Sequence, residues 1–141
     1  MMKNLNLARN RITSIPEDIG KMSKLENFNA SQNLLQSIPS SFQQLKHLRE
    51  VCLSFNHLTT FPLSLLALKQ LNIIELSNNK ITKIPSDIAK LEATELVLNC
   101  NQISVIAPEI SQCPKLKTLR LEENCLAIDS IPTSLLAERF G

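Results

Sequence analysis

One asparagine recurs along the whole chain at a nearly fixed interval, and this feature constrains the fold more than any other. The intervals are 23, 23, 23, 22 and 23 residues, with the asparagines at Asn10, Asn33, Asn56, Asn79, Asn101 and Asn124. Each closes the same frame: apolar residues stand five and three positions before it, and another stands two positions after it. Such self-similarity predicts copies of one structural unit that bury their apolar sides by stacking.

The apolar residues before each asparagine alternate with other residues, as in Leu5-x-Leu7 and Ile74-x-Leu76. A period of two predicts a short strand with one buried face, and six such strands would form a parallel sheet about 25 Å along the stack. The asparagine carries both an acceptor and donors on a short side chain, so it can bond the backbone of its own and the adjacent turn. We therefore interpret the asparagine ladder as structural.

The returning half of each unit is predicted to be extended or to form a short helix. An apolar residue and a proline follow the asparagine at Ile15-Pro16, Ile38-Pro39, Phe61-Pro62 and Ile84-Pro85. Proline fixes φ and removes a donor, which disfavours a long α-helix. A further apolar position follows on this side, at Ile19, Phe42, Leu65, Ile88, Ile110 and Leu135. The predicted fold class is an α/β solenoid with a parallel concave sheet and extended, 3-10 or short helical convex segments.

We expect one domain over residues 1–141, with six repeats at about 2–24, 25–47, 48–70, 71–92, 93–115 and 116–141. The fourth repeat is one residue short. Pro132 lies eight residues after Asn124 instead of six, so residues 127–130 are expected to form a bulged loop. Solenoids need polar caps on their terminal repeats, and the sequence suggests none. Either the chain is a fragment of a longer protein, which is the simpler explanation, or a partner covers its ends.

The pattern resembles the intracellular class of leucine-rich repeats of about 23 residues, found in Ras-pathway scaffolds and polarity proteins. Residues 88–136 resemble more narrowly the family of leucine-rich repeat-containing protein 57, in the segments around Asn101 and Asn124, the short fourth repeat and the late Pro132. That family offers no catalytic residues to transfer. Its N-terminal extension, which opens with a myristoylation-type glycine, has no counterpart here, so membrane anchoring is not carried over.

The charge, apolar content and cysteine spacing of the chain argue against some classes of partner and location. The formal net charge is +2, from 15 basic and 13 acidic residues, and no run of like charges stands out. This balance argues against a nucleic-acid partner. No apolar stretch is long enough to span a membrane, so insertion by this segment is not expected. The four cysteines are widely spaced, which favours a reduced, cytoplasmic protein. Membrane association through a missing N-terminal lipid signal stays open.

We expect the binding surface to consist of the residues that alternate with the buried positions and point into the concave face. The middle of this face combines an aromatic ring, apolar area and charges that can orient a partner, as binding hot spots usually do. The candidate residues are Glu50, Cys52, Phe55, His57, Ile73, Glu75, Val97, Arg120 and Glu122. The alternative is that these outward positions tolerate almost any residue, since isolated apolar residues on a surface are ordinary.

Catalysis is not expected. Cys52 and His57 superficially resemble a nucleophile and its base, but an open sheet provides neither a water-excluding pocket nor oxyanion donors. Two histidines and no glycine-rich loop also argue against metal and nucleotide sites, so no cofactor is expected.

The leading hypothesis is a non-catalytic adaptor that holds a protein or peptide on its concave sheet. The alternative is the recognition or regulatory part of a larger enzyme or signalling complex, such as a ubiquitin ligase, kinase, phosphatase or Ras-pathway scaffold. A third possibility is a fragment of an extracellular receptor; the glycan-acceptor pattern Asn29-Ala30-Ser31 is interpreted as accidental without a signal peptide.

Overall fold

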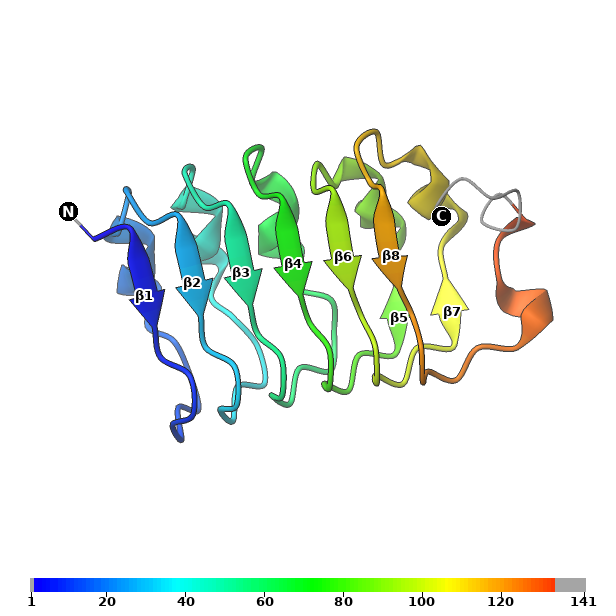
Figure 1. Cartoon of the computed structure of the whole chain (residues 1–141), viewed down its shortest axis with the longest axis horizontal. Coiled ribbons are helices and arrows are strands. Elements are labelled where there is room, and N and C mark those ends of the chain that lie inside the picture. Colours follow the sequence, from blue (N-terminus) through cyan, green and yellow to red (C-terminus); the bar gives the residue numbers. More distant parts are fainter. Residues whose placement is uncertain (1, 134–141) are drawn as a thin grey trace.

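The structure is a computed structural model that describes residues 2–133. Its main feature is a parallel sheet of six strands in the order β1-β2-β3-β4-β6-β8 (Figure 1). The strands are β1 (Asn4–Asn6), β2 (Asn27–Asn29), β3 (Glu50–Cys52), β4 (Ile73–Glu75), β6 (Glu95–Val97) and β8 (Thr118–Arg120). Each strand begins 22 or 23 residues after its neighbour and pairs with it in register. The solenoid fold is therefore confirmed.

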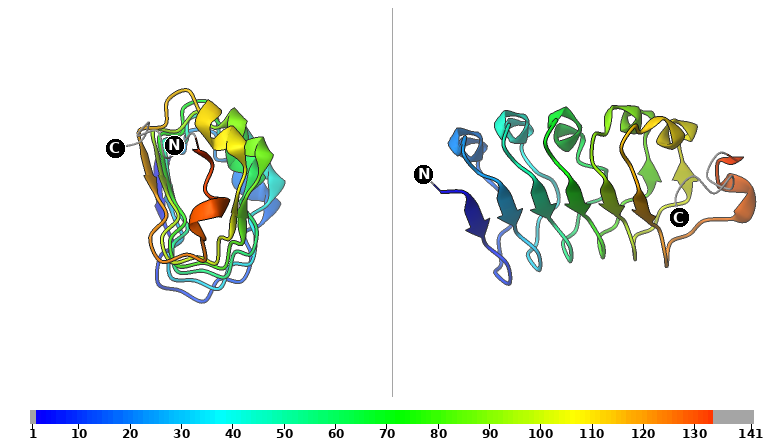
Figure 2. Two further views of the ribbon diagram at one scale, coloured as in Figure 1. Left: turned by 90° about the vertical axis from the view of Figure 1, so that its right-hand side faces the viewer. Right: turned by 45° about the horizontal axis from the view of Figure 1, so that its top comes forward.

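The chain returns through short 3-10 helices on the side opposite the sheet (Figure 2). These are η1 (Glu17–Lys21), η2 (Ser40–Gln44), η3 (Leu63–Ala67), η4 (Ser86–Lys90) and η5 (Pro108–Gln112). Each of the first four begins directly after a proline in extended conformation, which confirms the expected short convex segments. The convex apolar position predicted at Leu135 lies outside the described residues.

The later repeats differ from the first three on the convex side. Here β5 (Lys83–Ile84) pairs in parallel with β7 (Val105–Ile106), forming a second, two-stranded sheet. In the sixth repeat the extra residues contain a 3-10 turn, η6 (Ile128–Ser130), where we had expected a bulged loop.

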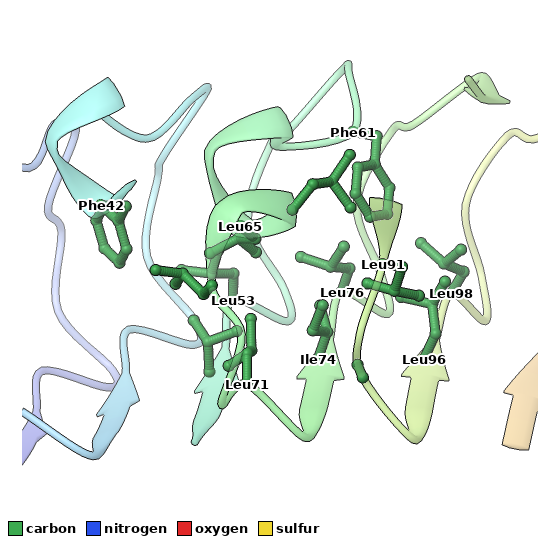
Figure 3. Close-up of a cluster of buried hydrophobic side chains, with 14 of the residues drawn as sticks. Phe42, Leu53, Phe61, Leu65, Leu71, Ile74, Leu76, Leu91, Leu96 and Leu98 are labelled. Carbon is green, nitrogen blue, oxygen red and sulfur yellow. The ribbon is translucent and has the colours of Figure 1, made fainter. Parts of the chain in front are cut away.

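The core is a continuous column of aliphatic side chains between the sheet and the 3-10 helices (Figure 3). The strands contribute residues such as Ile74 and Leu76, and the convex helices contribute residues such as Leu65, all almost wholly buried. Near the N-terminal end, the Phe28 and Phe42 rings meet edge to face with centroids 5.3 Å apart. In the first and last repeats the equivalent strand residues, among them Leu5 and Leu119, are only partly buried.

Gly20 is the one position of η1 where a side chain has no room. A methyl carbon there would lie 2.9 Å from the Ser41 carbonyl oxygen and 2.5 Å from Gln44 Oε1. We expect Gly20→Ala to lower the free energy of unfolding by about 1–3 kcal/mol, because overpacking forces the neighbouring turn to shift. Chemical denaturation would measure the loss. Adding Gln44→Ala should not restore stability, since the Ser41 carbonyl remains; full recovery would contradict a backbone clash.

Candidate binding surface

The loops that follow the strands are held in place by the asparagine ladder. Asn56 is representative: its Nδ2 donates to the carbonyl oxygens of Ala30, Leu53 and Ser54 at 3.0, 3.0 and 3.2 Å, and its Oδ1 accepts from the Leu35 N–H at 3.0 Å. Two of these bonds join different repeats. A network that pairs buried backbone groups in this way makes the loops a rigid support for outward-facing side chains.

The residue just before each ladder asparagine adopts a left-handed backbone conformation. The six residues are Arg9, Gln32, Phe55, Asn78, Cys100 and Glu123, with φ between 55° and 61°. Because this conformation occurs in every repeat, it belongs to the architecture and does not mark a special site. Its consequence is a regular row of side chains at the edge of the concave face, in which the Phe55 ring is 52% exposed.

Strand register brings most of the predicted site residues into two adjacent rows. Glu50 pairs with Ile73, and Ile73 with Glu95, in the first row. The second row runs Cys52, Glu75, Val97 and Arg120. These residues meet because the strands are parallel and unshifted, so equivalent positions lie about 4.8 Å apart.

The remaining predicted residues lie on the loops after the strands. Phe55 and His57 follow β3, and Glu122 follows β8, where its carboxylate lies 3.6 Å from the Arg120 guanidinium. The predicted site therefore divides into a sheet part and a loop part.

Val97 differs from the expectation of an outward, accessible side chain. It is only 8% exposed, and its strand lies in register between Glu75 and Arg120. Both neighbours have longer side chains than valine, so Val97 lies low between them. It contributes to the base of the surface more than to its contact area.

The Cys52 thiol lacks the electrostatics of an activated nucleophile. Burial raises its pKa, and the Glu75 carboxylate across the strand pair adds to the rise. A reactive cysteine needs the opposite shift, because the thiolate is the nucleophile. The Cys52 sulfur is paired with Ser54 Oγ at 3.6 Å.

The N-terminal part of the concave face carries asparagines that the predicted set did not include. Asn4 and Asn27 are joined by a side-chain hydrogen bond, while Asn6 and Asn29 accept from the backbone N–H groups of Ala8 and Ser31. Together with Glu50 and its neighbours they line a shallow hollow of about 390 Å³. The concentration of asparagine at outward positions of the first two strands was the available sequence signal.

A larger hollow, of about 580 Å³, lies on the convex side across the third repeat. Its lining includes Phe61, Pro62 and Leu63, with Ile38 and Pro85 from the neighbouring repeats. Pro62 is buried and has a ψ of 95°, whereas the equivalent Pro39 is partly exposed with a ψ of 152°. The two prolines therefore differ in conformation and burial beside this hollow, which is not at the predicted site.

On the loops of the last two repeats, the carboxylates of Glu122 and Glu123 change the pKa of the Cys100 thiol. Cys100 donates to Glu123 Oε2 at 3.2 Å, and this hydrogen bond, followed by burial and the charges of Glu123 and Glu122, raises the Cys100 pKa.

We expect Glu123→Gln to lower this pKa and to speed alkylation of Cys100 by iodoacetamide at pH 8 about two- to fivefold, because more of the thiol is ionised. Peptide mass spectrometry would follow the reaction. Glu109→Gln, on the convex side, should leave the rate unchanged; equal acceleration by both would contradict the assignment.

Two further observations concern residues 2–133, the part of the chain that the structure describes. No three His, Cys, Asp or Glu side chains gather there in an arrangement that could hold a metal ion. No helix within the same range has the length and apolar character needed to cross a membrane.

Comparisons with known proteins agree with this architecture. Two family models, both described as leucine-rich repeat, match residues 2–58 and 70–91. Among solved structures, the plant peptide hormone receptor RGFR1 in complex with RGF2 is similar at a TM-score of 0.70 and 36% identity, over 81% of this chain and 19% of the receptor chain. The Leptospira interrogans LRR protein LIC12759 has a TM-score of 0.50 and 22% identity, over 91% of this chain and 50% of its own.

The chain belongs to the leucine-rich repeat proteins. It spans about a fifth of the receptor chain and half of the bacterial one. Domains of this family generally mediate protein–protein interaction and are typically not enzymes.

Proposed function

We propose that this chain is a non-catalytic adaptor that binds a protein or peptide on its concave face. The observation that carries the proposal is the combination of an exposed Phe55 ring with the charged row of Glu75 and Arg120, on strands fixed in register. A rigid surface with an aromatic anchor and flanking charges binds with little loss of conformational entropy. The similarity to a receptor solved in complex with RGF2 adds support.

A second candidate is that these repeats form the recognition part of a larger enzyme or signalling complex. The chain matches only 19% of the receptor chain, so repeats like these do occur within a much longer protein. In this case the catalytic step resides in another domain or subunit, and the concave face still makes the contact.

The proposal includes a cytoplasmic location, based on the wide spacing of the four cysteines, which is typical of reduced proteins. It also includes the narrower kinship with the family of leucine-rich repeat-containing protein 57, based on residues 88–136. Nucleic acid is not proposed as a partner.

Replacing Phe55 and Glu75 together with alanine is expected to weaken capture of native partners about tenfold or more, since hot-spot truncations cost at least about 2 kcal/mol. Quantitative mass spectrometry of proteins retained by the immobilised chain would measure the effect. The matched control is Leu63→Ala with Glu109→Ala, which removes an apolar and an acidic side chain from the convex side. A partner lost equally from both variants, or retained by both, would reject the concave site.

A further inference from the structure

The loops that follow the first four strands of the sheet lie along the lower edge of Figure 1 and carry positive charge without any carboxylate. These loops, residues 8–13, 31–36, 54–59 and 77–82, are here called the basic edge. The first loop contains Arg9 and Arg11 and the fourth contains Lys80, while none of the four contains aspartate or glutamate, although the whole chain has a net charge of only +2. The corresponding loop of the fifth repeat is uncharged, and that of the sixth is acidic. Although acidic and basic residues are evenly mixed along the sequence, the edge formed by these loops is positively charged.

The cations of the basic edge are exposed and available. Within residues 2–133, none of these three cations has a carboxylate partner within ion-pair distance, whereas Lys3, Lys69 and Lys115 each have one. Two exposed apolar residues, Leu34 and Phe55, lie between the two arginines and Lys80 along the sheet. Their exposed fractions are 42% and 52%. Cations therefore flank an apolar centre.

Backbone hydrogen bonds anchor the loops of the basic edge to one another. The N–H groups of Leu34, His57 and Lys80 donate to carbonyl oxygens of the preceding repeat at 2.8–2.9 Å. The side chains of the basic edge therefore project from a fixed framework.

We propose that the basic edge binds a short acidic peptide segment that carries an aliphatic or aromatic anchor for Leu34 and Phe55. This inference rests on the proposed protein-binding function and names the chemistry of the partner. Three strand-to-strand steps of about 4.8 Å separate the first and fourth loops by about 14 Å, the length of about four extended residues. Acidic side chains at the two ends of such a segment reach the arginines and Lys80 while its centre covers the apolar pair.

The neighbouring charges favour a short peptide over a long polyanion. Glu50, Glu75 and Glu95 lie on the strands of the concave face, and Glu122 and Glu123 lie on the loop of the sixth repeat, beyond the basic edge. Like charges placed side by side suppress the wrong partners. An extended RNA or an anionic membrane surface would meet these carboxylates, whereas a short segment along repeats one to four avoids them.

The test is selection of 12-residue peptides from a displayed library on the immobilised chain, followed by fluorescence polarisation of the enriched peptides. We expect the enriched peptides to combine net negative charge with a Leu, Phe or Trp. Arg9→Glu with Arg11→Glu should weaken their binding about tenfold or more, and Leu34→Ser or Lys80→Glu about three- to fivefold. Glutamate is tolerated in the left-handed conformation of position 9, since Glu123 adopts it in the sixth repeat.

The control is Lys24→Glu with Lys46→Glu, which changes the net charge equally on exposed residues after η1 and η2 and should leave binding unchanged. Enrichment of neutral or basic peptides, or binding sensitive to Glu75→Ala but not to the basic-edge variants, would overturn this inference and leave the proposed concave site intact. Failure to enrich any peptide would also overturn it, while the capture experiment decides the proposed function separately. Oligouridylate of 20 nucleotides and phosphatidylserine–phosphatidylcholine vesicles serve as further probes. Binding of either that is lost in the Arg9/Arg11 variant would replace the peptide with that class of ligand.

Discussion

Replacing Asn79 with alanine is expected to lower the free energy of unfolding by about 1–3 kcal/mol, because the buried Leu58 N–H loses its hydrogen-bond acceptor. The Asn79 side chain is buried. Its Nδ2 donates to the carbonyl oxygens of Leu53, Leu76 and Ser77 at 3.0, 3.0 and 3.3 Å, and its Oδ1 accepts from the Leu58 N–H at 3.0 Å. Alanine removes all four bonds; the three carbonyl oxygens keep other donors, on Asn56, Asn101 and Phe55, whereas the Leu58 N–H has no second acceptor among the described residues. Urea denaturation followed by circular dichroism would measure the loss.

Asn10→Ala is the matched control, because the residue type and the substitution are the same. Asn10 is exposed, and its Nδ2 donates only to Leu7 and Ala8 of its own repeat. Its replacement should cost less than about 1 kcal/mol, since water can reach the groups it leaves. If the two variants lost equal stability, the between-repeat bonds to Leu53 and Leu58 would not be what stabilises the ladder.

The repeat could be read from the sequence because its requirements are set by the backbone. A turn inside a solenoid needs donors and an acceptor at one fixed place, and asparagine supplies them in the smallest side chain that can. The strand residues are equally constrained, since a shift by one residue would turn Ile74 and Leu76 to solvent. The fold class and the parallel sheet therefore followed from periodicity, and the short convex segments from the recurring prolines.

The departures from regularity could not be predicted, because they depend on the conformations of individual neighbours. Nothing in the residue type distinguishes Pro62 from Pro39, yet a difference in ψ of 57° between them accompanies the convex hollow. The burial of Val97 similarly depends on which side chains stand in register with it, Glu75 and Arg120. The second sheet, β5–β7, forms where two convex segments run side by side, and no sequence motif predicts this pairing.

The candidate surface was predictable in position but not in specificity. Periodicity identifies which residues face outward, and register then determines that Cys52 and Glu75 are neighbours. Outward positions carry no packing constraint, however, so their residue types reflect the partner and not the fold. The basic edge is formed by the fold and does not stand out along the chain, where several acidic residues separate Arg9 and Arg11 from Lys80.

Phe42→Ala should be among the most destabilising single substitutions, at about 3–5 kcal/mol, because it leaves a large cavity in a dry core. The ring is wholly buried beneath η2 and meets the Phe28 ring edge to face at 5.3 Å. Denaturant unfolding would measure the total loss. Hydrogen exchange would locate it: because each repeat contacts only its neighbours, amides near Phe28 and Ala30 should lose more protection than the amide of Leu98.

Phe42→Leu tests whether the effect comes from lost volume. Other repeats carry isoleucine or leucine at this position, among them Ile19 and Leu65, so leucine suits the backbone and should cost less than about 1.5 kcal/mol. A loss as large as that of alanine would mean that the edge-to-face contact with Phe28, not the filling of the layer, stabilises the second repeat. A loss of protection spread evenly to Leu98 would contradict nearest-neighbour stabilisation and indicate that the solenoid unfolds as one cooperative unit.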